Sequence, residues 1–456
     1  MSVISEPPPR SALQDSRIWL VRAYEAARKK IRDTDDVEAH AAFWLLGLLN
    51  NAAYVIMLAG ANELSSGGAG LVYFWAEFPS ILVKASGPYW FHHFSYKTRL
   101  WAVAVMMGLS YTIVALSSSL PVALIGVSIG SFQGGLGESS CLGLSALYDN
   151  RRAITFWSSG TGAAGVFGYS WVALLHTWGG MSLSATLLLA NSTCLAWLAI
   201  LHFLLRPPKA PQIQVDGHSK PDTRPDGMPS PEEAEEYNLE DGRSKLGRRS
   251  GQLSSASEDA RISGDQERVR DRMHTMSTRE RVRRTLALWP YMVPLLVVYF
   301  AEYTLQAGAW TAMGFPVEDK VARDHFYKVA GWLYQAGVFL SRSSGLLYQA
   351  SRGVLWALPA VQMVLLLLFS LNAWWHFWYN GSLYILCLVV GLIGGGVYVN
   401  AFTLIGKEVD PAYREFSLTA ASVADSVGIT LADLAGVLLE GCLFRLNHLP
   451  GALFSC

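Results

Sequence analysis

Long apolar runs constrain this chain more than any other feature of its sequence. A transmembrane helix needs about 20 mostly apolar residues to cross a bilayer, and such runs, bounded by charged or turn-forming residues, recur along the 456 residues. Hydrophobic residues make up 51% of the chain and charged residues only 16%, which disfavours a water-soluble globular protein. We therefore predict an all-α integral membrane protein with about eleven transmembrane helices.

The apolar runs fall into two groups on either side of a polar stretch. The predicted spans cover approximately residues 39–60, 68–94, 98–118, 120–147, 152–175 and 181–205, and then 285–312, 324–347, 351–372, 380–405 and 413–442. The stretch 206–284 is rich in Pro, Ser, Gly, Glu and Arg, cannot bury enough apolar surface to offset its ordering entropy, and is predicted to be disordered. Six spans, a linker and five spans are typical of a two-halved transporter that lacks one terminal helix. The predicted parts are a segment 1–38, a first helical half 39–205, the linker 206–284, a second helical half 285–442 and a tail 443–456.

Basic residues in the short loops predict the orientation, because Lys and Arg near a span favour the cytoplasmic side. Loops after even-numbered spans carry these residues: Lys97, Arg99, Arg151, Arg152, Arg342, Arg352, Lys407 and Arg414. Loops after odd-numbered spans are nearly free of them, with Lys320 and Arg323 as the exception. The N-terminal segment and the linker are thus predicted to be cytoplasmic and the C-terminal tail luminal. Asn380 begins an Asn-Gly-Ser sequon on the predicted luminal side, where glycosylation is one candidate modification.

Acidic residues inside the predicted spans are the first candidates for function, because ionisable groups in a membrane normally face a bundle interior or a wet cavity. Glu302 lies deep in the seventh span, Glu138 in the fourth, and Asp425 and Asp433 two turns apart in the eleventh. We expect them to serve a substrate or proton path, with a structural polar contact as the alternative. Glu77 and Lys84, in the second span, have the alternative of snorkelling at a frayed helix end.

Neutral polar residues within the spans predict a hydrogen-bonding pocket for a polar solute. Asn50, Asn51 and Tyr54 lie in the first span, and Tyr398 and Asn400 in the tenth. Hydrogen bonds between helices are the alternative.

No motif of a soluble enzyme, metal site or cofactor site is present in the sequence. A phosphate loop, GxSxG and HExxH are absent, and the five cysteines have no metal-ligand spacing. The basic residues lie in polar segments around apolar runs, which argues against nucleic-acid binding. We expect a protein that is not an enzyme and holds neither metal nor cofactor.

Several stretches in the spans resemble one family in its order along the chain. They are FWLLGLLNNAAYVIML from Phe43, GLGE from Gly135, WSSGTGAAG from Trp157, VVYFAEY from Val297, YQAGVFLSRSS from Tyr334, GGGVYVNAF from Gly394 and REFSLTAASVADSVGI from Arg414. The chain resembles the battenin family, the lysosomal and vacuolar membrane proteins whose human member is associated with Batten disease.

The resemblance implies a fold similar to the major facilitator superfamily, in the limiting membrane of the lysosome or the fungal vacuole. Family members are linked to luminal pH homeostasis, to basic amino-acid transport in fungi and to clearance of glycerophosphodiesters in animals. The family's intramembrane acids, cytoplasmic arginine and polar first-span pair fall here on Glu138, Glu302, Asp425, Arg342, Asn50 and Asn51. Arg342 and Arg414 are expected to take part in gating or to lie in a cytoplasmic loop. The linker's EEAEEYNLE departs from an acidic dileucine signal, because Glu240 occupies the position of the second leucine.

These observations predict a vacuolar or lysosomal transporter that exports a small polar or zwitterionic solute, such as arginine or a glycerophosphodiester, by alternating access between its halves. Its expected partners are that solute, protons and the lipid bilayer. The alternative is a membrane regulator of proton pumping or vesicle trafficking that binds protein partners through its linker.

Overall fold

The computed structural model describes residues 37–57, 69–205 and 276–450. The predictions for residues 1–36, for residues 58–68 around the end of the first span, for the linker up to residue 275 and for residues 451–456 of the tail fall outside these residues. The described part is helical and contains no β-strand.

The first half supplies a helix for each of its six predicted spans. It begins with the helix Val37–Met57. The next elements are α3 (Ala69–Trp90), the short η1 (Phe91–His93), α4 (Tyr96–Leu116), α5 (Leu120–Ser145) and α6 (Asn150–Val172) with its extension η2 (Ala173–Trp178). The sixth span is made of three consecutive elements, α7 (Leu183–Ala190), α8 (Ser192–Ala199) and η3 (Ile200–Leu204).

The second half supplies the other five spans. Its elements are α10 (Thr278–Ala287), α11 (Trp289–Thr304) with η5 (Leu305–Ala309) and η6 (Trp310–Ala312), α12 (Lys320–Ser343) with η7 (Ser344–Leu346), α13 (Arg352–Trp375), α14 (Leu383–Glu408), α15 (Pro411–Ala421) and α16 (Val423–Leu446). Ser422 separates α15 from α16 within the predicted last span, and α16 extends beyond the predicted boundary at 442.

Eight helices of the described part are long and apolar enough to cross a membrane. The other three spans, α3, α6 and α12, carry polar or charged side chains toward the interior of the bundle, among them Lys84, Thr161 and Arg342. The predicted all-α membrane fold is confirmed, with a helix at each of the eleven predicted segments and eight of them long and apolar enough to cross a membrane.

The prediction of a disordered linker over 206–284 is wrong for residues 278–284, which form most of α10. The side chain of Ser277 caps this helix by accepting a hydrogen bond from the Glu280 amide at 3.3 Å. Buried Arg281 donates to the Pro88 carbonyl at 2.5 Å, so tertiary contacts offset the ordering entropy of this segment.

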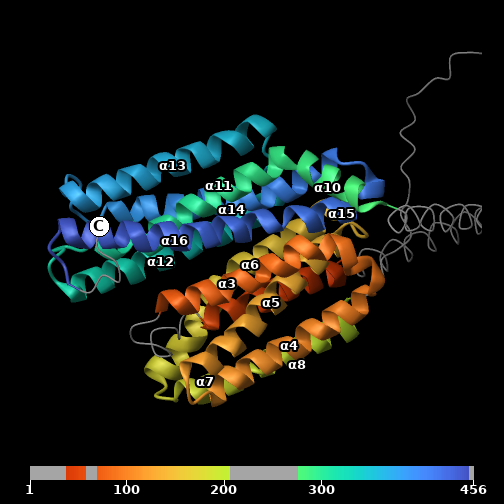
Figure 1. The fold of residues 1–456 in the computed structure, drawn as a ribbon, viewed down its shortest axis with the longest axis horizontal. Helices are drawn as coiled ribbons and strands as arrows, with labels where there is room; N and C mark the ends of the chain where they lie inside the picture. Colours follow the sequence, from red (N-terminus) through yellow and green to blue (C-terminus); the bar gives the residue numbers. More distant parts are fainter. Residues whose placement is uncertain (1–36, 58–68, 206–275, 451–456) are drawn as a thin grey trace, which may run out of the picture. The chain divides into compact units, whose positions relative to one another are not determined.

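Small residues allow the helices to approach closely, as expected where lipid supplies no hydrophobic drive for association. A Cβ on Gly160 would collide with the Trp44 carbonyl oxygen, and one on Gly428 would lie 2.6 Å from the Leu296 carbonyl oxygen. Between the halves, α6 packs on α12 and α14, α16 packs on α3, and α15 packs on α5 (Figure 1).

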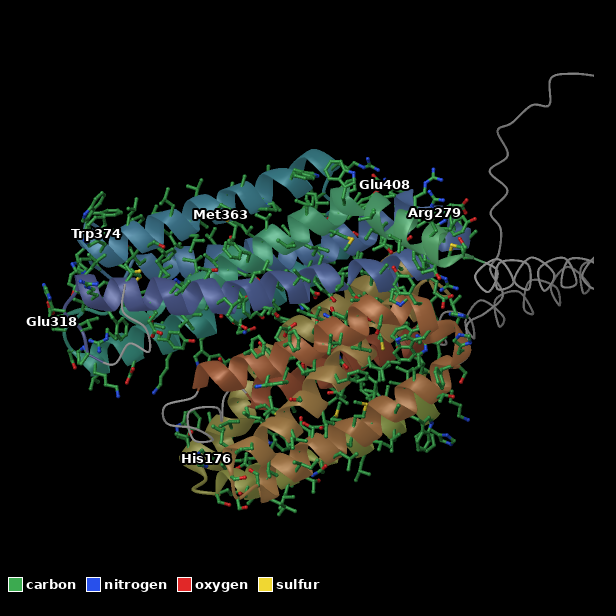
Figure 2. All side chains as sticks on the ribbon, in the orientation of Figure 1. His176, Arg279, Glu318, Met363, Trp374 and Glu408 are labelled. Carbon is green, nitrogen blue, oxygen red and sulfur yellow. The ribbon has the colours of Figure 1, made fainter. Side chains whose placement is uncertain are left out.

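The helix ends define two sides of the bundle. Figure 2 shows Arg279 and Glu408 at one end and His176, Glu318 and Trp374 at the other. We call the first the linker end, because α10 follows the linker there. Hydrogen bonds join the halves near this end: Tyr96 donates to Glu415 at 2.5 Å, Arg151 donates to the Gly345 carbonyl at 3.2 Å, and further pairs are Ser139–Ser422 and Ser159–Ser343. The two halves are therefore closed against each other on the linker side.

Candidate functional site

A polar cavity of about 70 Å³ lies between the two halves. The first half lines it with the helix Val37–Met57, α3, α5 and α6, and the second with α11, α12, α14 and α16. Its charged lining residues are Glu77, Lys84, Glu138, Arg342 and Asp425. A solute in this cavity would touch both halves at once.

Lys84 is the centre of an ion cluster that crosses from one half to the other. Its ammonium group lies 2.6 Å from Glu138 Oε2 on α5 and 3.0 Å from Asp425 Oδ1 on α16, and it donates to Ser426 Oγ at 2.8 Å. The Lys84 side chain is only 4% exposed. Because a buried cation needs paired charge and hydrogen bonds, two carboxylates balance this one.

Arg342 has a different environment, made of neutral groups. Its guanidinium donates to Thr161 Oγ1 at 2.6 Å and to Tyr299 OH at 2.7 Å, and lies 4.1 Å from the centre of the Tyr398 ring. Among the residues that the structure describes, no carboxylate lies within 4.0 Å of it, and its buried Nε has no hydrogen-bond partner. The expected loop position of Arg342 is wrong, because the residue belongs to the last turn of α12 and lines the cavity.

Tyr398 connects the two clusters. Its hydroxyl donates to Glu138 Oε1 at 2.5 Å and accepts from Trp157 Nε1 at 3.3 Å, while its ring stacks under Arg342. The positions of Glu138 and Arg342 are therefore coupled through one side chain.

The three predicted residues of the first span all line the cavity. Asn50 donates to the Gly134 carbonyl at 3.1 Å and accepts from Gln133 at 3.0 Å, and Asn51 donates to the Thr161 carbonyl at 3.3 Å. Asn50 and Asn51 thus make the interhelical hydrogen bonds of the alternative interpretation while also bordering the cavity.

Glu302 lies outside the cavity lining, inside the second half. It is 1% exposed, accepts from Tyr334 OH at 3.0 Å through Oε1, and has a buried Oε2 without a hydrogen-bond partner beside Gly394. Its neighbours Tyr299 and Tyr303, one turn apart on α11, face the cavity instead.

The remaining predicted site residues lie apart from the cavity. Asn400 accepts from the Ala350 amide at 2.7 Å and donates to the Gly396 carbonyl. Asp433 is half-buried on α16 and does not line the cavity, so it does not share a cavity border with Asp425.

Arg414 lies half-buried within α15 and not in a loop. Exposed Asn380 lies in the connection between α13 and α14.

Glu77 and Lys84 are functional candidates that sequence reasoning underrated. Both line the cavity with Ser80, and the spacing 77, 80 and 84 places the three on one face of α3. That spacing was the signal available in the sequence. No group of three or more His, Cys, Asp or Glu residues in the described ranges could hold a metal ion.

The comparisons with solved structures identify the fold. The proton:xylose symporter XylE, of the major facilitator superfamily, aligns with a TM-score of 0.55 at 12% identity over 88% of each chain. The human organic anion transporter MFSD10 aligns with a TM-score of 0.54 at 13% identity over 91% of this chain and 97% of its own. These similarities show that the two helical halves adopt a major-facilitator fold.

The comparisons with sequences identify the family. Protein btn-1 of Neurospora crassa is 33% identical over 93% of this chain and 93% of its own length, and battenin of Canis lupus familiaris is 30% identical over 89% and 91%. The sequence model of the family described as CLN3 protein matches residues 41–446. The chain is therefore a multi-pass membrane protein that belongs to the CLN3 protein family, the battenin family that its motifs resemble.

Proposed function

We propose that this protein is a vacuolar or lysosomal transporter, not an enzyme, and that its cavity carries a small zwitterionic solute across the membrane by alternating access. The supporting observation is the pairing of charges in the cavity. Lys84 is balanced by Glu138 and Asp425, whereas Arg342 has only neutral partners.

Glu77 is the matching negative group. Among the described residues, no basic side chain lies within 4.0 Å of its carboxyl group, which lines the cavity. A solute with an anionic group toward Arg342 and a cationic group toward Glu77 would complement both. Arginine and a glycerophosphodiester with a cationic head group meet this requirement, and export of such solutes would link the protein to vacuolar pH when protons move with them.

Uptake into liposomes that contain only the purified full-length protein tests this proposal. The solutes are labelled arginine and glycerophosphocholine, with an uncharged sugar as the control. Arg342→Gln and Glu77→Gln should each raise the KM of the transported zwitterion roughly 10- to 100-fold, because each loses a charge-assisted contact of about 1.5–3 kcal/mol. Arg445→Gln, an exposed position at the opposite end of α16, is the matched control and should leave the KM unchanged.

Unchanged KM values in the Arg342 and Glu77 variants would refute the proposed recognition. If the wild-type protein moves none of these solutes, the regulatory alternative gains support. Deletion of residues 215–270 then distinguishes the two functions, because a regulator acting through its linker loses its effect on vacuolar pH whereas a transporter keeps it.

A further inference from the structure

A short helix at the linker end has two different faces. The helix α10 has the sequence TRERVRRTLA and ends one residue before α11, which is long and apolar enough to cross the membrane. Since α11 begins at Trp289, the C-terminal end of α10 lies within about a turn of the start of a helix that can span the bilayer.

The inner face of α10 is fixed to both halves of the protein. Arg281 is 4% exposed and donates to the carbonyl of Pro88, in the last turn of α3. Arg284 lies 3.4 Å from the centre of the Tyr413 ring on α15 and pairs with Glu280 at 2.7 Å. These contacts set which side of α10 points outward.

The outer face combines basic and apolar side chains. Arg279, Val282, Arg283 and Leu286 follow the i, i+3, i+4, i+7 spacing of one helix face, and all four are exposed. Leu286 is 69% exposed and Val282 is 42% exposed, so apolar surface lies beside the two arginines on this face. Within the described ranges, neither Arg279 nor Arg283 has a carboxylate within 4.0 Å.

Two exposed aromatic residues, Trp289 and Trp356, lie just beyond the C-terminal end of α10. Trp289 is 57% exposed and packs edge-on against Trp356 of α13 at 5.7 Å between ring centres. Exposed tryptophans are typical of the level at which head groups meet acyl chains. Arg283 and Arg279 precede Trp289 by about two and about three helical turns, so we expect their guanidinium groups to reach the level of lipid phosphates.

We propose that the outer face of α10 is a binding site for anionic phospholipid head groups of the leaflet at the linker end. Arg279 and Arg283 pair with the head groups, while Val282 and Leu286 enter the boundary of the acyl chains. An interfacial amphipathic helix has the same arrangement, and its affinity for a membrane combines apolar burial with attraction to anionic lipid. Because α10 is bonded to both halves, binding should also stabilise the folded protein.

Thermal unfolding of the purified full-length protein in detergent tests this assignment. Titration with short-chain phosphatidylserine should raise the apparent Tm, whereas phosphatidylcholine of the same chain length should have little effect. Arg279→Gln combined with Arg283→Gln should weaken the apparent affinity for phosphatidylserine about 30-fold, which corresponds to about 2 kcal/mol for the pair of arginines. High salt should weaken binding by the wild-type protein in the same direction.

Two controls decide the result. Arg152→Gln removes an exposed arginine from α6 at the same end and should leave the affinity unchanged. Leu286→Ser keeps the charges but removes the apolar contact, so it should weaken binding to phosphatidylserine and not binding to inorganic phosphate. An unchanged affinity in the double arginine variant, an equal loss in Arg152→Gln, or an equal stabilisation by inorganic phosphate or phosphatidylcholine would overturn the proposal. Deuterium exchange of α10 amides gives a second readout, since phosphatidylserine should slow it in the wild-type protein and not in the double variant.

Discussion

Replacement of Lys84 by methionine should destabilise the protein strongly, because it leaves two acidic groups without their cation. Methionine has a similar length and apolar character, so the change removes the charge and little of the packing. Glu138 and Asp425, at 15% and 6% side-chain exposure, would lose their partner at 2.6 and 3.0 Å. Loss of one partner of a buried ion pair costs about 3–5 kcal/mol, and we expect a loss in this range.

The assay is thermal unfolding of the full-length protein in detergent. Taking about 2 °C per kcal/mol for a chain of this size, Lys84→Met should lower the apparent Tm by roughly 6–10 °C. Lys97→Met, an exposed lysine at the start of α4, is the matched control and should change the free energy of unfolding by less than about 0.5 kcal/mol. Addition of Asp425→Asn to Lys84→Met should recover part of the loss, with a coupling of roughly 1–3 kcal/mol in the double-mutant cycle.

If the Tm of Lys84→Met lies within about 2 °C of the wild type, Lys84 is not needed to balance the two carboxylates, which then reach water or another cation when Lys84 is lost. Additive effects of the two substitutions would refute the ion pair itself.

Three further predictions follow from other contacts. Gly394→Ala should lower the free energy of unfolding by roughly 1–3 kcal/mol, because the new Cβ collides with Glu302 Oε2. Gly134→Ala is the control and should be neutral, because a Cβ there has no atom within 4 Å. Equal melting temperatures of the two variants would contradict the close packing of Gly394 on Glu302. Tyr96→Phe should speed amide hydrogen exchange at the start of α15 about fivefold, because it removes a hydrogen bond to Glu415 worth about 1 kcal/mol. Unchanged exchange would show that this hydrogen bond does not hold the linker side closed. If Glu302 carries the coupled proton, Glu302→Gln should abolish uptake driven by a pH gradient and preserve solute exchange. Gradient-driven uptake at the wild-type rate would exclude that role.

Hydropathy predicts the membrane fold because the backbone N–H and C=O groups of each span must form their hydrogen bonds within one helix. This requirement is local in sequence. The apolar runs and loop charges therefore predict where helices form. The helix α10 is the exception, since its order depends on contacts such as that of Arg281 with Pro88, 193 residues away. A compositional argument treats such a segment as an isolated peptide and predicts disorder.

The candidate site was predictable only in part, because burial in a span does not tell which face of the helix a residue occupies. Glu302 and its neighbours Tyr299 and Tyr303 are equally deep in the seventh predicted span, yet the tyrosines line the cavity and Glu302 packs against Tyr334. Lys84 is a similar case. Its partner Asp425 is 341 residues away, and only the packing of α3 on α16 brings them together.

Alternating access requires the two halves to separate at the linker end, and one engineered cross-link tests this requirement. Ser159 Oγ on α6 and Ser343 Oγ on α12 lie 2.9 Å apart across the two halves, so cysteines at both positions are close enough for a disulfide. The native free cysteines Cys141, Cys194 and Cys387 are buried and should not compete. Solute uptake by the Ser159→Cys/Ser343→Cys protein in liposomes should stop on oxidation and return on reduction, while either single variant stays active. Uptake at the wild-type rate by the fully oxidised, cross-linked protein would mean that transport does not require the halves to separate at the linker end.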